Sequence, residues 1–121
     1  MAKARILLIE DEATSREILQ YALSEAGYAV DVAATAAAAH AYLGSALYGL
    51  VIADWQLPDG DGIYLADRAT GLGSQTLIIT GHVSDLPAGT AKRHHLLIKP
   101  VKPAELLGVV RAIIGEPRVT D

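Results

Sequence analysis

Five short apolar runs alternate with longer segments of mixed polarity along the chain. Most of the runs are continuously apolar rather than alternating, as in ILLI, LVIA and LIIT. Continuous apolar strands are typical of a parallel sheet that is covered on both faces. The sequence therefore predicts five buried strands, at Arg5 to Ile9, Ala29 to Ala33, Leu50 to Ala53, Thr76 to Thr80, and Leu96 to Ile98.

The segments between these runs have helical spacing. Apolar residues recur every four positions before Gly27, which is placed to end a first helix. Thr35 is a suitable N-cap for a second helix through about Leu43, and Gly44 is placed to end it. The chain therefore alternates strand and helix from its beginning.

The sequence predicts the third and last helices more clearly than the fourth. A third helix is expected from Gly62 to Ala69, whereas Pro87 and Gly89 interrupt the segment after Val83, so a fourth helix there is expected to be abbreviated. The last helix begins with Pro103, because proline at the first turn loses no hydrogen bond. Its apolar stripe consists of Leu106, Leu107, Val110 and Ile114.

A strand–helix unit repeated five times indicates a doubly wound parallel sheet with helices on both faces. The 121 residues suffice for a single domain with its own core, here residues 1–121 with a short tail at about 115–121. In such sheets a ligand site lies outside the carboxyl ends of the strands.

Composition and charge narrow the function classes. The chain has no cysteine, no apolar run near the roughly 20 residues of a membrane span, and too short an apolar stretch at its beginning for a signal peptide. We therefore expect a soluble, cytoplasmic protein that does not contact a membrane. A net charge of −4 does not favour nucleic-acid binding by this domain.

Chemically useful residues stand where four of the predicted strands end. The first strand ends in Glu10-Asp11-Glu12, the third in Asp54, the fourth in Thr80, and the fifth in Lys99-Pro100. Each is unremarkable alone, because acids and lysines are common in loops and at helix starts. Their convergence at one edge of the sheet points to a site.

Clustered carboxylates repel one another, so such a site needs a cation. Magnesium prefers carboxylate oxygens and often joins a substrate phosphate. A lysine and a threonine hydroxyl can hold other phosphate oxygens, and a carboxylate can itself attack phosphorus to form an aspartyl phosphate. The strand ends therefore predict magnesium-dependent phosphoryl chemistry.

Over essentially its whole length, the sequence resembles the receiver domain of bacterial response regulators. Four ordered motifs carry the resemblance: ILLIEDE at residues 6–12, DWQLPDGDG at 54–62, TGH at 80–82, and KPV at 99–101. The resemblance implies a flavodoxin-like fold with five parallel strands in the order 2-1-3-4-5.

The resemblance also implies a role for each motif residue. Asp54 is implied as the phosphoacceptor, in a two-component or phosphorelay system. Mg²⁺ is implied as cofactor, bound by Asp11, Asp54 and the Gln56 backbone carbonyl, and by Glu10 through water. Thr80 and Lys99 are implied to bind the phosphoryl group, and Gly81 to leave the acceptor open to a donor.

The donor implied by the resemblance is a phosphohistidine on a histidine kinase or a histidine phosphotransfer protein. The same site would slowly hydrolyse its own phosphate, so the protein is expected to be no enzyme beyond this self-modification. The Lys99–Pro100 bond is predicted to be cis, partly from the resemblance and partly because X-Pro bonds have only a small trans preference, about 0.5–1 kcal/mol.

One position departs from the family pattern. Leu96 stands three residues before Lys99, where the family usually has an aromatic residue that changes rotamer on activation. A leucine has neither the ring nor the hydroxyl, and we expect it to be a packed core residue. Signalling is then expected to depend on the loop from Thr80 to about Pro87.

Two other function classes are a receiver that only binds proteins and a small phosphohydrolase. A degenerate receiver that only binds proteins would have no need of Asp11, Asp54, Thr80 and Lys99 together. A small phosphohydrolase with an aspartyl nucleophile would need a general acid two residues after Asp54, where Gln56 stands, and a cap over its substrate. The phosphorylatable receiver is the preferred reading.

Overall fold

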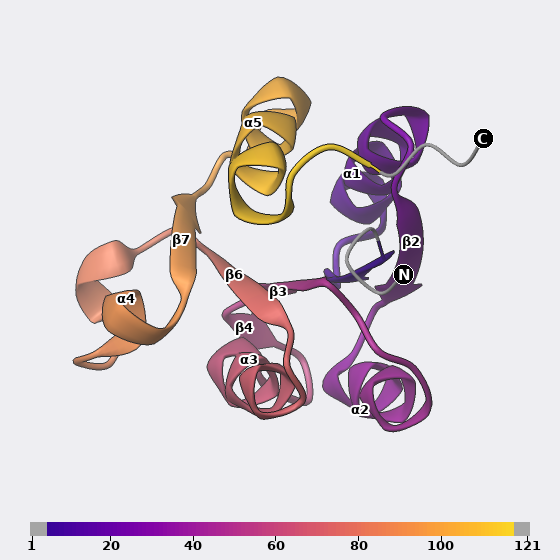
Figure 1. Ribbon diagram of the computed structural model, residues 1–121. Coiled ribbons are helices and arrows are strands. Elements are labelled where there is room, and N and C mark those ends of the chain that lie inside the picture. Colours follow the sequence, from indigo (N-terminus) through magenta and orange to yellow (C-terminus); the bar gives the residue numbers. More distant parts are fainter. Residues whose placement is uncertain (1–4, 118–121) are drawn as a thin grey trace.

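The computed structural model describes residues 5–117, and a five-stranded parallel sheet lies at its centre (Figure 1). The strands lie in the spatial order β2-β1-β3-β6-β7, which is the predicted order 2-1-3-4-5 along the chain. Their bounds are β1 Arg5–Ile9, β2 Ala29–Ala33, β3 Leu50–Asp54, β6 Gln75–Thr80 and β7 His95–Ile98. The predicted fold is confirmed.

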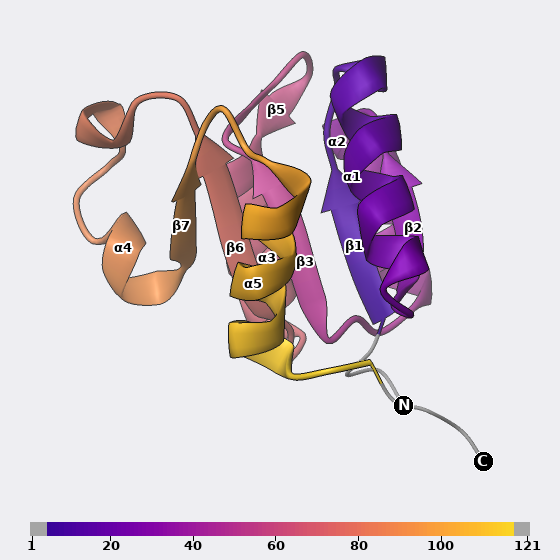
Figure 2. The same ribbon diagram turned by 90° about the horizontal axis from the view of Figure 1, so that it is seen from above.

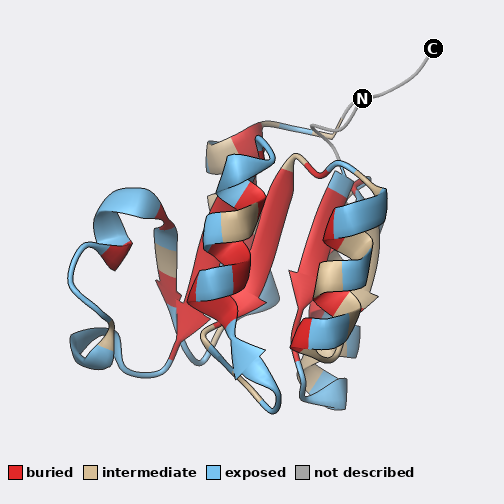
Figure 3. Cartoon of the chain, turned by 90° about the horizontal axis from the view of Figure 1, so that it is seen from below, coloured by how far each residue is buried: buried red, intermediate tan, exposed pale blue. Residues whose placement is uncertain are grey.

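Two helices cover each face of the sheet, as Figures 1 and 2 show. Helices α1 (Ala13–Glu25) and α5 (Pro103–Ile114) lie on one face, and α2 (Ala36–Ser45) and α3 (Gly62–Gly71) lie on the other. Each face has its own core of buried aliphatic side chains, so the strands between the two layers are largely buried (Figure 3). This double burial is the physical reason for the continuous apolar runs in the sequence.

The helix ends mostly follow the expected capping residues. The Thr35 side chain accepts a hydrogen bond from Ala38 N, and Gly27, with φ of 106°, follows the end of α1. The expectation that Gly44 ends α2 is wrong, because the helix continues to Ser45. Gly44 is not among the described glycines with positive φ, so it does not form the left-handed turn that ends a helix.

The fourth helix is abbreviated, as predicted. Only a short 3-10 turn, η2 (Val83–Asp85), and a single helical turn, α4 (Thr90–Arg93), join β6 to β7. Residues 90–93 lie beyond the β7 edge of the sheet (Figure 1).

A small antiparallel hairpin follows β3 and was not predicted. It consists of β4 (Gln56–Leu57) and β5 (Gly60–Asp61), and it projects beyond the carboxyl end of the sheet (Figure 2). The end of the predicted tail, residues 118–121, lies outside the described residues. No helix within residues 5–117 has both the length and the apolar character to cross a membrane.

Candidate functional site

Three carboxylates meet at the carboxyl ends of the two central strands. Strand β1 pairs with β3 in a register that places Ile9 opposite Ala53, so the residues that follow each strand are neighbours. Oxygens of Glu10, Asp11 and Asp54 lie within 4.8 Å of one another. The structure therefore brings together the acids that the sequence singled out.

Asp54 is the most constrained of the three. It is 1% exposed, and among the described residues its two carboxylate oxygens are the buried side-chain oxygens that accept no hydrogen bond. The Lys99 ammonium lies 3.1 Å from Asp54 Oδ1 as an ion pair, with its own side chain 46% exposed. A buried carboxylate without hydrogen bonds is costly unless another group binds it.

The electrostatics of Asp54 reflect this environment. Burial is the main cause that raises its pKa, from 3.8 to about 8; contact with the Glu10 carboxyl raises it further and Lys99 opposes the rise. For Lys99, burial lowers the pKa, but the carboxylates of Asp54, Glu10 and Asp11 together outweigh burial and the net pKa is raised. The site therefore has a deficit of positive charge.

The acidic turn after β1 is fixed by hydrogen bonds from its own helix. Glu10 Oε2 accepts from Glu12 N at 3.0 Å, and Glu12 in turn caps α1 by accepting from Ser15 N at 2.7 Å. The Arg16 guanidinium donates to the carbonyls of Glu10 at 3.0 Å and Asp11 at 3.3 Å. Arg16 was not singled out from the sequence, since an arginine in the first turns of a helix has no distinctive signal.

The ends of β6 and β7 supply the other predicted groups. Lys99 N donates to the Thr80 carbonyl at 2.9 Å, which places Lys99 beside the end of β6. Thr80 is buried, and its hydroxyl oxygen accepts from His82 N at 3.1 Å. Gly81 is exposed with open space around its Cα, and the Lys99–Pro100 peptide bond is cis, as expected.

The loop after β3 passes close to Asp54. Gln56 is exposed and begins β4, two residues after Asp54. At Gly62 an added Cβ would lie 1.8 Å from the Asp54 carbonyl oxygen, and Gly62 N donates to the Trp55 carbonyl at 2.6 Å. The position of Asp54 therefore depends on the absence of a side chain at Gly62.

An open pocket of about 650 Å³ adjoins the acids. Charged residues form one side of it, and apolar side chains of α1 and of the segment after β7 form the other. The lining comprises Glu10, Asp11, Glu12, Ser15, Ile18, Leu19, Ile79, Lys99, Pro100 and Val101. The carboxylates of Glu10 and Asp11 are therefore open to solvent on this side, and Lys99 lines the same pocket.

Leu96 lies in β7 opposite Ile78, half-buried against the core of the α2–α3 face. The Leu96 side chain therefore packs against the core, as expected, but it is partly exposed and is not one of the fully buried core residues. The segment before it is fastened by a polar contact that the sequence did not suggest.

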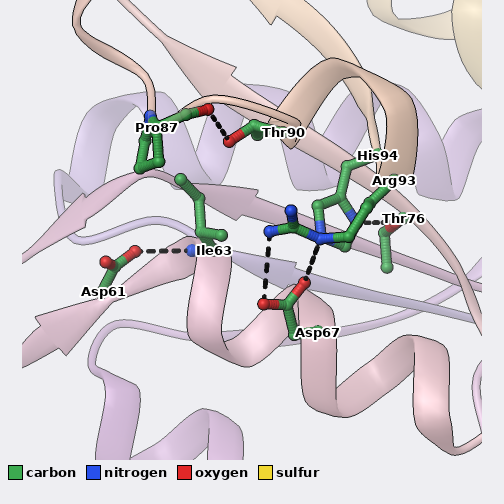
Figure 4. Close-up of polar contacts among 8 residues, drawn as sticks. All are labelled: Asp61, Ile63, Asp67, Thr76, Pro87, Thr90, Arg93 and His94. Carbon is green, nitrogen blue, oxygen red and sulfur yellow. Dashed lines mark hydrogen bonds and ion pairs between the residues drawn. The ribbon is translucent and has the colours of Figure 1, made fainter.

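Figure 4 shows this contact around His94, which follows α4 and whose side chain is 0% exposed. Its Nε2 lies 2.6 Å from Asp67 Oδ1, and its Nδ1 lies 2.5 Å from the Thr76 hydroxyl. Asp67 on α3 also accepts from Arg93 Nε at 3.2 Å. Burial raises the pKa of Asp67, but the bonds from His94 and Arg93 outweigh burial, and the net pKa is lowered. We call Asp67, Thr76, Arg93 and His94 the α4 clamp.

The acidic cluster fits a hard divalent cation. Magnesium takes carboxylate oxygens and keeps several waters. This matches a site in which Glu10 and Asp11 line an open pocket and oxygens of the buried Asp54 lie within 4.8 Å of theirs. The structural observation that favours this fit is that neither Asp54 oxygen accepts a hydrogen bond and only Oδ1 has an ion pair, with Lys99, because a cation would satisfy both oxygens.

The family comparison agrees with this geometry. The model of the response regulator receiver domain matches residues 6–111. The transcriptional regulatory protein PmrA of Pectobacterium parmentieri is 42% identical over 91% of this chain and 52% of its own length. The probable transcriptional regulatory protein SilR of Salmonella typhimurium is 34% identical over 97% of this chain and 54% of its own. The chain spans about half the length of these curated relatives.

Solved structures show the same fold. A CheY-like receiver domain protein from Methanospirillum hungatei has 27% identity and a TM-score of 0.79 over 89% of this chain and 90% of its own. The response regulator TrrA of Thermotoga maritima, solved in complex with Mg²⁺ and BeF, has 27% identity and a TM-score of 0.78, covering 90% of this chain and 97% of its own.

Proposed function

Because this chain belongs to the response regulator receiver domains of two-component systems, we propose that Asp54 accepts a phosphoryl group from a phosphohistidine. The donor is a histidine kinase or a histidine phosphotransfer protein. The observation that carries the proposal is the buried Asp54 carboxylate, which accepts no hydrogen bond, pairs with Lys99 and lies beside two further acids.

Asp11, Asp54 and the backbone carbonyl of Gln56 are the residues proposed to hold Mg²⁺ directly, with Glu10 acting through water. When bound, the cation neutralises charge on the carboxylates and on the transferring phosphoryl oxygens. The acid cluster supports this assignment. The solved complex of TrrA with Mg²⁺ and BeF adds support by similarity.

In the proposed transfer an Asp54 carboxylate oxygen attacks phosphorus, and the bond from phosphorus to the donor imidazole nitrogen breaks. The imidazole leaves with the bonding electron pair and then carries a proton. Lys99 supplies a positive charge to one phosphoryl oxygen, and the Thr80 hydroxyl donates a hydrogen bond to another. Attack of water on the same phosphorus returns the free carboxylate and inorganic phosphate.

Signal output is proposed to start at Thr80. The added phosphoryl group brings about −1.5 to −2 charge, which Lys99 and Thr80 meet by local movement. Since Leu96 is half-buried against the core, we propose that it stays packed and that the loop from Thr80 to Pro87 is displaced.

The two other function classes lack support of this kind. A receiver that only binds proteins does not need a buried Asp54 that accepts no hydrogen bond, because an apolar residue there would be more stable. A phosphohydrolase needs a general acid near the nucleophile, and Gln56 is not one.

Intact-mass measurement after incubation with acetyl phosphate and Mg²⁺ tests the proposal. We expect one added phosphoryl group on the wild type, none on Asp54→Asn, and severely reduced labelling of Asp11→Asn. Asp85→Asn, at an exposed acid of η2, is the matched control and is expected to label normally. Full labelling of Asp54→Asn would overturn the assignment.

A further inference from the structure

A fourth carboxylate near the site has a different contact. Asp59 lies in the turn of the β4–β5 hairpin, and both its oxygens accept from the first turn of α2. Oδ1 accepts from Ala36 N at 2.7 Å, and Oδ2 accepts from Ala37 N at 3.0 Å. The contact joins residues more than 20 positions apart in sequence, so it fastens the tip of the hairpin to a helix on the α2–α3 face.

The tip and the helix lie close together. A Cβ added at Gly60 would lie 2.8 Å from the Ala36 Cβ, so only glycine allows this approach. Thr35 accepts from Ala38 N, and the first three free N–H groups of α2 therefore all have acceptors. The two backbone bonds also hold the pKa of Asp59 below its usual value, so the carboxylate is ionised at neutral pH.

The base of the hairpin has its own anchor. Gln56 pairs with Asp61, and Asp61 caps α3 by accepting from Ile63 N at 2.7 Å, as Figure 4 shows. The hairpin is therefore held at two points, its base on α3 and its tip on α2. Gln56 lies at the base, opposite Asp61, and the Asp59 bonds fix the tip of the same two-stranded segment.

We propose that Asp59 is a positioning residue for the metal site, because its bonds to α2 set where the Gln56 backbone carbonyl lies. The inference rests on the proposed role of that carbonyl as a ligand. A main-chain ligand is set by the path of its segment rather than by its own side chain. The groups that anchor the hairpin therefore do what hydrogen-bond partners do for a side-chain ligand, which is to orient it toward the metal.

A purely structural role for Asp59 predicts something different. If the carboxylate only caps α2, its loss costs helix stability and leaves Mg²⁺ affinity unchanged. Thr35 provides the comparison, because its side chain caps the same helix by accepting from Ala38 N and, within residues 5–117, forms no hydrogen bond with the hairpin. The two residues therefore separate capping of α2 from positioning of the hairpin.

The experiment is a MgCl₂ titration of the whole chain, followed by the fluorescence of Trp55, which is the one tryptophan and follows Asp54 directly. The variants are Asp59→Ala, Asp59→Asn and Thr35→Ala. Asp59→Ala is expected to raise the Mg²⁺ Kd by about three- to tenfold. This is at or below the lower end of the effect of removing a group that orients a metal ligand, because the contact is exposed. Asp59→Asn keeps one acceptor oxygen and is expected to lose less affinity.

Thr35→Ala is expected to lower the unfolding midpoint with no change in the Mg²⁺ Kd. An unchanged Kd in Asp59→Ala overturns the inference, as does an equal loss of affinity in Thr35→Ala. If the fluorescence of the wild type does not respond to Mg²⁺ and acetyl phosphate does not label it, the proposed function itself is refuted. The two failures are therefore distinct.

Discussion

Replacing Asp54 by asparagine is expected to stabilise the metal-free protein, by an amount that grows with pH. The pKa of Asp54 is raised from 3.8 to about 8, first by burial and then by the Glu10 carboxyl. A carboxyl group whose pKa is higher in the folded state favours folding below its unfolded pKa, and this contribution is lost as pH rises through the folded pKa. The wild type therefore loses stability between about pH 4 and pH 8 through this group, and the D54N variant does not.

The size of the effect is bounded by the same values. Each pH unit between the two pKa values removes about 1.4 kcal/mol, so the upper bound at pH 7 is about 4 kcal/mol. Asparagine buries an amide without a partner, which costs about 1–3 kcal/mol. The ion pair with Lys99 is not subtracted again, because the pKa of about 8 already includes its effect. The expected gain at pH 7 is therefore at most about 1–3 kcal/mol, and it vanishes near pH 5.

The assay is urea unfolding with a metal chelator, followed by circular dichroism at about pH 5, 6 and 7.5. The D85N variant, altered at an exposed acid, is the control and is expected to follow the wild type. Saturating Mg²⁺ is expected to stabilise the wild type but not D54N, since only the wild type keeps the full set of proposed ligands. Parallel stability–pH curves for wild type and D54N in chelator would refute the reasoning.

Three further outcomes are expected. Thr76→Val removes the hydroxyl beside His94 Nδ1 and is expected to cost about 1–3 kcal/mol of unfolding free energy, because a buried ring nitrogen loses its partner. Gly62→Ala is expected to cost about 3 kcal/mol or more and to weaken labelling by acetyl phosphate, since its Cβ would collide with the Asp54 carbonyl. Beryllofluoride is expected to shift the NMR signals of the Thr80–Pro87 loop while the Leu96 methyl signals change little.

Each of these has a control or a contrary result. Thr70→Val, at an exposed position of α3, is expected to change the free energy of unfolding by no more than about 0.5 kcal/mol. A loss as large as that of Thr76→Val would show that the contact of Thr76 with His94 is not the cause. Gly71→Ala has open space around its Cβ in the same helix and is expected to be tolerated. Large beryllofluoride shifts at Leu96 with a silent Thr80–Pro87 loop would contradict the proposed output route.

Sequence reasoning was most successful where burial dictates the residue type. Strand β3 is buried along its whole length, so LVIAD could only be a central strand with its terminal acid at the carboxyl edge. The parallel arrangement then fixes which residues share that edge. The convergence of Asp54, Thr80 and Lys99 was therefore predictable without knowledge of any side-chain contact.

The contacts that fasten the site were not predictable in the same way. The Asp59 bonds to α2 and the His94 contact with Asp67 each join one residue to another more than 20 positions away, and no periodic pattern marks such pairs. The clash that excludes a side chain at Gly62 depends on a close approach of backbone segments that only coordinates reveal. Single long-range polar contacts carry little sequence signal, although they decide local geometry.

The α4 clamp bears on how a signal leaves the site. Its bonds to Thr76 and Asp67 hold His94 at the end of α4, and Leu96 continues into a strand paired with β6. If Thr80 moves toward a phosphoryl group while His94 stays fixed, residues 81–89 must take up the displacement. Within that stretch the hydrogen bonds join residues only two to four positions apart, and Gly89 has a φ of 89° at the start of α4. The fixed far end therefore directs the proposed movement into residues 81–89, and the packed leucine at position 96 has no part in it.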